Sequence, residues 1–222
     1  MKQCLQYPNG RPTESNIINK KAVLCLSLVE YSASQLKKVV EKLLAQFGKF
    51  DVVLFDSVQR YNLMWTQHLS ADAAHQKAVA LGNTWLTDYA NIFNNDAIKM
   101  FRWDEWLSSP RFAAQKKMSE QLYHDQPGFK ESVDTTAADY LTKYAQRHSD
   151  FDGEQARALS VELIKEEAAG ILLAADLQYD FDVSFRKKPA LKYLSEHIIH
   201  QQHPELLQPI VVTTHVKNRY EI

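Results

Sequence analysis

The sequence predicts an α/β protein with a mostly parallel, doubly wound sheet of about five strands. Short apolar runs rich in β-forming residues begin near residues 22, 51, 98, 179 and 209, and helical patterns separate them. The first two runs and the helical pattern between them form one right-handed βαβ unit. The helical patterns between residues 110 and 175 are more than the sheet faces need, which indicates an added helical layer.

The first unit has the clearest pattern. Residues 22–28 form a continuous apolar run that is too short for a helix, as expected of a strand buried on both faces. Apolar side chains at three- and four-residue spacing then predict a helix over about 35–47, with Ser34 as its N-cap and Gly48 as its C-cap. Residues 51–56 form the second buried strand.

The remaining elements follow from the same periodicities. Helices are expected over 70–93, 110–123, 129–146, 153–175 and 189–200, and strands over 98–101, 179–185 and 209–214. Residues 1–21 contain Pro-Asn-Gly and Arg-Pro turn signals, so an irregular N-terminal arm is expected there. Residues 22–222 are expected to form a single Rossmann-like domain.

Composition sets the broad class. The chain has 222 residues, 45% of them hydrophobic, and a formal net charge of −1, so it is no global polycation, although a local basic patch stays open. No apolar run approaches the roughly 20 residues of a membrane span, and the N-terminus lacks a secretory hydrophobic segment. A cytoplasmic monomer without membrane contact is expected. Cys4 and Cys25 suggest neither a disulfide framework nor a thiolate metal site.

The usual cofactor motifs are missing from the sequence. It has neither G-x-G-x-x-G after the first strand nor G-x-x-x-x-G-K-[ST], so the common phosphate-binding loops are absent and no cofactor is expected. His197, His200 and His203 are three residues apart, which spreads them across a helix surface. A solvated helix end is favoured over a metal site, and no metal is expected.

Two residues stand out as candidates for chemistry. Ser27 ends the first strand, and ligands of open α/β sheets bind at the carboxyl ends of strands. The alternative is a strand-end serine that satisfies loop backbone groups. Glu167 lies one turn after Leu163 on the apolar stripe of its helix, where an ionised carboxylate needs a partner or a wet cleft. The alternative is that Glu167 reaches water beside Glu166.

Four stretches then carry a family resemblance. They are Asp-Ser-Val-Gln-Arg-Tyr-Asn-Leu-Met at 56–64, Gly-Asn-Thr-Trp-Leu at 82–86, Arg-Trp-Asp-Glu-Trp-Leu at 102–107, and Glu-Glu-Ala at 166–168 followed by Tyr-Asp-Phe-Asp at 179–182. Over residues 22–200 the chain resembles the cyclodipeptide synthases, in particular the subgroup without an asparagine in the loop after the catalytic serine. The resemblance implies a Rossmann-like core similar to that of class I tyrosyl- and tryptophanyl-tRNA synthetases, but without ATP binding. It also implies the activity of the family, in which the amino acids of two aminoacyl-tRNAs are joined into a diketopiperazine.

The resemblance also implies roles for individual residues. Ser27 matches the nucleophile that receives the first aminoacyl group, and Glu167 matches the carboxylate that holds its α-amino group. Val23 and Cys25 match the first aminoacyl pocket, with Cys25 in place of a usual glycine. The other positions matched to substrate binding are Val53 and Phe55 of the second pocket, Gln59, Tyr61, Leu163 and Ser184.

This chain departs from the family pattern in three places. Leu163 stands where the family has a tyrosine, Ser184-Phe185 replaces a Tyr-Pro pair, and Glu30 occupies the position of the loop asparagine. Loss of a tyrosine hydroxyl removes a hydrogen bond. Two alternatives therefore stay open, namely aminoacyl transfer to a different acceptor and a non-catalytic relative that binds tRNA.

Aminoacyl-tRNA is the expected partner. Arg60 and Arg102 follow the carboxyl ends of strands, at the edge that presents Ser27, and Lys187 with Lys188 could extend this edge into a phosphate-binding track. The alternative is that both arginines are internal ion-pair partners of acidic residues at 56 and 104. Tryptophans at 85 and 103 are candidates for stacking on the terminal adenine.

Overall fold

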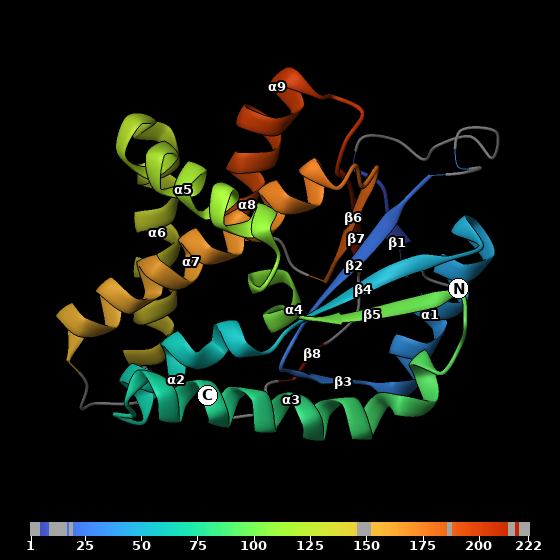
Figure 1. Cartoon of the computed structure of the whole chain (residues 1–222), viewed down its shortest axis with the longest axis horizontal. Coiled ribbons are helices and arrows are strands. Elements are labelled where there is room, and N and C mark those ends of the chain that lie inside the picture. The colour runs from blue at the N-terminus through green and yellow to red at the C-terminus, as the bar shows by residue number, and fades with distance from the viewer. Residues whose placement is uncertain are drawn as a thin grey trace.

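The protein folds around a six-stranded, mostly parallel sheet (Figure 1). The computed structural model describes residues 5–8, 17, 20–145, 152–185, 188–212 and 216–217. The strand order is β1-β7-β6-β2-β4-β5, and only the β1–β7 pair is antiparallel. These strands are β1 (Leu5–Gln6), β2 (Ala22–Ser27), β4 (Phe50–Phe55), β5 (Ile98–Arg102), β6 (Phe181–Ser184) and β7 (Gln208–Val212). A separate two-stranded sheet joins β3 (Glu30–Tyr31) to β8 (Val216–Lys217).

Helices cover both faces of the sheet. Those on one face are α1 (Ala33–Phe47) and α3 (Ala71–Phe93). The opposite face carries α4 (Trp103–Leu107), α5 (Pro110–Asp125), α6 (Pro127–Ala145), α7 (Gly153–Asp176) and α8 (Pro189–Tyr193). The connecting elements are a 3-10 turn (Ser57–Gln59), α2 (Arg60–Thr66), a π-helical segment (Leu194–Ile199) and α9 (His200–Gln202). The predicted α/β class with a Rossmann-like sheet is confirmed.

Several predicted boundaries change. Leu5 and Gln6 pair with β7 although an irregular arm was predicted there, because the Leu5 side chain is buried in the core. Ser32, and not Ser34, precedes the first helix, and its carbonyl oxygen accepts the first helical hydrogen bonds. The predicted helix over 189–200 is interrupted by the π-helical segment. The predicted ends at residue 146 and at residues 213–214 lie outside the described residues.

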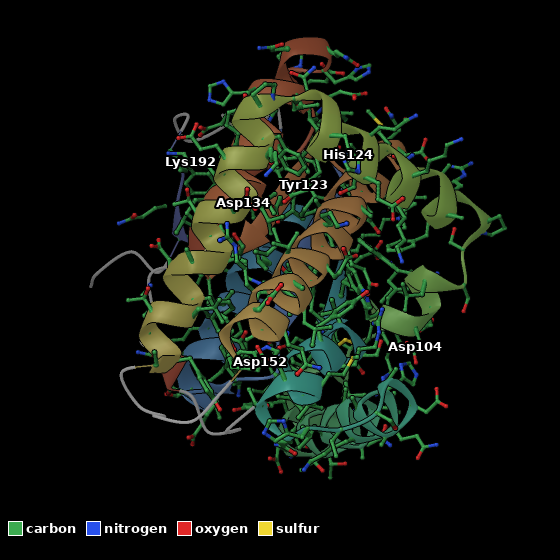
Figure 2. All side chains as sticks on the ribbon, turned by 90° about the vertical axis from the view of Figure 1, so that its left-hand side faces the viewer. Asp104, Tyr123, His124, Asp134, Asp152 and Lys192 are labelled. Atoms are coloured by element: carbon green, nitrogen blue, oxygen red, sulfur yellow. The ribbon has the colours of Figure 1, made fainter. Side chains whose placement is uncertain are left out.

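The predicted helical layer consists of α5 and α6, which pack on α7 (Figure 2). Tyr123 of α5 donates a hydrogen bond of 2.9 Å to Asp134 of α6, and Lys130 pairs with the same carboxylate at 2.6 Å. A groove of about 440 Å³ opens between these helices, and its lining contains neither Ser27 nor Glu167. The groove therefore belongs to the packing of the layer and is separate from the sheet edge described below.

Helix α7 lies close to the sheet edge because it carries a glycine where a side chain would not fit. A Cβ atom on Gly170 would overlap the six-membered ring of Trp103, which is fully buried. The close approach brings α7 against the first residue of α4. The glycine at this helix position therefore serves packing, at the usual cost in helix propensity of about 1 kcal/mol.

We expect Gly170→Ala to destabilise the protein by about 1–3 kcal/mol, because overpacking outweighs the gain in helix propensity. The measurement is the free energy of unfolding in urea. Trp103→Phe removes the ring atoms that the new methyl group would meet, so the double variant should lose less stability than the sum of the two single variants. Strict additivity would contradict the contact.

Candidate active site

The candidate site lies at the carboxyl ends of the central strands. The chain runs from β2 outward to β4 and β5 and then returns to β6 on the other side of β2, so β2 is the topological switch point of the sheet. Ser27 is the last residue of β2 and lies opposite Phe55, the last residue of β4. Ligands of open α/β sheets bind at this place. The strand geometry thus puts Ser27 at the expected mouth of the sheet.

The residues matched to aminoacyl pockets share one sheet face. Cys25 is paired in register with Val53 on one side and with Ser184 on the other. Val23, Val53 and Phe55 belong to the core cluster under α7, and Cys25 packs against that cluster. Because side chains alternate along a strand, Ser27 lies on the same face as Val23 and Cys25. Leu163 of α7 is buried in the same cluster.

Helix α7 presents two consecutive buried carboxylates toward this region. Glu166 is 1% exposed and Glu167 is 5% exposed. The alternative in which Glu167 reaches water is therefore wrong, and the neighbouring Glu166 is buried as well. The sequence pattern located one glutamate on the apolar side of the helix and missed the other, because α7 is buried around most of its circumference in this turn.

Glu166 is the centre of a polar cluster. Arg60 Nη1 donates to its Oε1 at 2.9 Å, and Arg60 Nη2 donates to its Oε2. Tyr61 Oη donates to Oε2 at 2.9 Å and Trp103 Nε1 donates to Oε1 at 2.8 Å. Burial acts to lower the pKa of Arg60, but the Glu166 carboxylate outweighs it and raises that pKa. Burial and then the Glu166 charge raise the pKa of Tyr61, so the phenol stays protonated.

Glu167 binds an ammonium group. Lys188 Nζ, just before α8, lies 2.7 Å from Oε1 and 2.6 Å from Oε2 of the Glu167 carboxylate. Burial is the main cause that raises the pKa of Tyr140 of α6 to about 12, and the negative charge of Glu167 raises it further. The expected phosphate contact of Lys188 thus gives way in this structure to an internal pair. Lys187 lies outside the described residues.

Arg60 and Arg102, both predicted to contact tRNA, form ion pairs within the protein. Arg102 Nε donates to Asp56 at 2.6 Å and its Nη1 donates to Asn83 at 2.5 Å, as the ion-pair alternative expected. Arg60 pairs with Glu166, and neither Asp56 nor Asp104 is its partner. Asp104 instead accepts a hydrogen bond of 2.5 Å from Ser57 and lies 3.2 Å from His75.

The other residues predicted to contact substrate or tRNA lie as follows. Trp85 and Trp103 are both 0% exposed, so neither can stack on an adenine, and this expectation was wrong. Gln59 is buried, and its side-chain oxygen Oε1 accepts a 2.7 Å hydrogen bond from Asn62 Nδ2. Ser184 ends β6 half-buried, beside Cys25.

Among the residues that the structure describes, no three side chains of the metal-binding types lie together, and His197 stacks on Tyr193 with ring centroids 4.6 Å apart. Within the same residues, none of the helices combines the length and the apolar character needed to traverse a bilayer.

Comparison with solved structures identifies the class of fold. The chain superposes on the tyrosyl-tRNA synthetase from Aeropyrum pernix with a TM-score of 0.56 at 10% identity, over 88% of this chain and 52% of that one. The protein thus has an α/β fold of the class I synthetase kind. No protein-family model matches the chain, and no curated protein matches it.

More similar structures define the fold further. A CDPS from Fluoribacter dumoffii aligns with a TM-score of 0.82 and 23% identity over 96% of this chain and 97% of that one. The cyclodipeptide synthase from Candidatus Glomeribacter gigasporarum, bound to Phe-tRNAPhe, aligns with a TM-score of 0.69 and 21% identity over 94% of each chain. The fold of this protein is the cyclodipeptide synthase fold, as the motif resemblance implied.

The Glu166 cluster can be tested through stability. Removing one partner of a buried ion pair leaves the other charge uncompensated, so we expect Arg60→Met to cost about 3–5 kcal/mol. The double variant Arg60→Met/Glu166→Leu should recover most of that loss in urea unfolding. Lys37→Ala serves as the control, because the Lys37–Glu41 pair is exposed and should contribute less than about 1 kcal/mol. Equal losses for the buried and exposed pairs would contradict this account.

Proposed function

We propose that the protein is a tRNA-dependent cyclodipeptide synthase that carries the first aminoacyl group on Ser27. The single observation that supports this most strongly is the buried Glu167 carboxylate, which holds an ammonium group with both oxygens. A buried carboxylate that is preorganised for an ammonium group suits the α-ammonium group of an aminoacyl substrate. Ser27 lies at the switch point where such a substrate would enter.

The proposed first step is a transfer between esters. Ser27 Oγ attacks the carbonyl carbon of the aminoacyl ester, the Oγ–C bond forms, and the bond from that carbon to the ribose oxygen breaks. The proton of the serine hydroxyl passes to the departing ribose oxygen. Because the ester on Ser27 keeps the activation of the tRNA ester, this step needs no ATP. The missing glycine-rich phosphate loops agree with such a reaction.

The second stage forms two peptide bonds. The amine of a second aminoacyl-tRNA attacks the ester carbon on Ser27, which forms the first peptide bond and returns a proton to Oγ. The remaining amine then attacks the ester carbonyl of the second tRNA, closes the ring and releases that tRNA. Glu167 would hold the first α-ammonium group and accept its proton before the amine attacks.

Lys188 has a defined place in this scheme. Its ammonium group forms an ion pair with Glu167 and resembles the amino group that the substrate would present. We assign Lys188 to the neutralisation of Glu167 before the substrate binds, with the substrate ammonium then taking its place. Val23, Cys25, Val53 and Phe55 would then line the aminoacyl pockets on the sheet face.

A second candidate function is aminoacyl transfer from Ser27 to a small amine or hydroxyl acceptor. The observation that favours it is Leu163, which is buried one turn before Glu167 and offers no hydrogen bond to the amine or ester of the first aminoacyl group. In that case Ser27 is still acylated, but the products are linear or conjugated compounds and not diketopiperazines. A non-catalytic relative would bind tRNA without acylation of Ser27.

The function is tested by expression in a bacterial host and by mass spectrometry of the medium. We expect cyclic dipeptides that disappear with Ser27→Ala. Glu167→Gln keeps the size of the side chain but removes its charge, so the product should fall by about 100-fold or more. Absence of cyclic dipeptides, together with an acylated Ser27 peptide after incubation with a charged tRNA pool, would favour the second candidate. Absence of both would reject catalysis.

The tRNA surface is tested through salt dependence. We propose that Lys187 contacts a phosphate, so Lys187→Glu should weaken tRNA binding and reduce the slope of log affinity against log salt by about 1. Lys188→Met is the matched control when the tRNA is uncharged, because no substrate amino group then displaces its ammonium from Glu167, and its loss should leave the slope nearly unchanged. An unchanged slope for Lys187→Glu would place the tRNA elsewhere, and a reduced slope for Lys188→Met would assign Lys188 to the phosphate track.

A further inference from the structure

The chain after Ser27 turns back so that a tyrosine hydroxyl reaches the serine. The backbone N–H of Val29 donates to the Ser27 carbonyl oxygen at 2.8 Å, which closes the turn. The Oη atom of Tyr31 then accepts a hydrogen bond from the backbone N–H of Ser27 at 3.2 Å. Tyr31 thus contacts the backbone of the candidate nucleophile.

Helix α3 holds this turn from one side. The Tyr89 hydroxyl accepts a 2.9 Å hydrogen bond from the Tyr31 N–H and donates a 2.8 Å hydrogen bond to the Tyr31 carbonyl oxygen. Trp85 Nε1 donates to the Val29 carbonyl oxygen at 3.1 Å. Both aromatic side chains are buried, so they form a fixed support for the turn.

Two other elements complete the support. The backbone of Tyr31 pairs with β8, and Figure 1 shows β3 and β8 beside α3 below the main sheet. The Tyr31 ring lies against Phe185, which follows β6, with ring centroids 4.6 Å apart. Only 5% of Tyr31 is exposed. The phenol is therefore fixed from several sides, as positioning a reacting atom requires.

The protonation state of this phenol limits what it can do. Burial raises the pKa of Tyr31 to about 12, against the opposing effect of hydrogen bonding with Ser27. The phenol is consequently neutral near pH 7 and is a poor proton acceptor. It still accepts the hydrogen bond from the Ser27 N–H, because a neutral phenol is a hydrogen-bond acceptor as well as a donor.

We propose that Tyr31 is a positioning residue for Ser27, whose phenol accepts a hydrogen bond from the Ser27 backbone N–H and so fixes the end of β2 from which Oγ attacks the aminoacyl ester. This inference rests on the proposed function of Ser27 as the aminoacyl acceptor. The phenol keeps its own proton during the transfer, since the serine proton leaves with the ribose oxygen. Its contribution lies in orientation, to which reaction rates are sensitive.

The first test compares Tyr31→Phe with Tyr89→Phe. Each variant removes one buried hydroxyl from the same support, but only Tyr31→Phe removes the contact with Ser27. We expect Tyr31→Phe to lower the rate of Ser27 acylation at saturating aminoacyl-tRNA by about tenfold, with the half-saturating concentration unchanged. Tyr89→Phe should lower the melting temperature at least as much, yet slow acylation by less than about threefold. An equal effect on the rate in both variants, or none in Tyr31→Phe, overturns the proposal.

The second test needs no tRNA. A fluorophosphonate probe reacts with nucleophilic serines, and the labelled Ser27 peptide can be followed by mass spectrometry in both variants. If wild-type protein is labelled by the probe but not by aminoacyl-tRNA, the proposed function fails while the role of Tyr31 is decided by the labelling rates. Slower labelling in Tyr31→Phe than in Tyr89→Phe supports it, and equal labelling overturns it. A wild-type Ser27 that reacts with neither reagent overturns both proposals.

Discussion

The hydrogen-bonded pairing of the buried Glu166 carboxylate is the interaction on which the rest of this site depends. The carboxylate accepts hydrogen bonds from Arg60, Tyr61 and Trp103, which come from two separate segments of the chain. A buried charge without these partners would be strongly unfavourable, so the contacts of Glu166 favour the observed arrangement of α7, α2 and α4. That arrangement fixes the rotation of α7 about its axis and thereby directs the next residue, Glu167, toward Lys188. One carboxylate thus serves the structure and its neighbour remains available for chemistry.

A second set of aromatic residues supports the opposite side of the sheet edge. Trp85 and Tyr89 of α3 hydrogen-bond to the backbone of the turn after Ser27. Gly82 of the same helix allows the Asp56–Arg102 pair to approach closely, because a Cβ at that position would lie 2.5 Å from an Asp56 oxygen. Helix α3 therefore braces both the end of β2 and the end of β5. Residues that seemed suited to nucleotide stacking are structural, because their hydrogen-bonding edges point inward.

The sequence pattern predicted most of the fold and part of the site. Continuous apolar runs located β2 and β4, since strands buried on both faces need apolar side chains at nearly every position. Strand-end position singled out Ser27, and the apolar stripe singled out Glu167. Residues 5–6 were missed because two residues that pair at a sheet edge carry no periodicity.

The sequence by itself determined the order of strands and helices, the lack of a phosphate-binding glycine loop, and the placement of Ser27 at a strand end. These features depend on local composition and periodicity, which neighbouring residues encode. Only the tertiary structure decided which basic side chain pairs with which carboxylate. Arg60 could have faced Asp56, Glu166 or solvent, and Lys188 could have faced tRNA or Glu167. Ion pairing between residues 21 or 106 positions apart depends on how helices rotate and pack, and no local pattern specifies that.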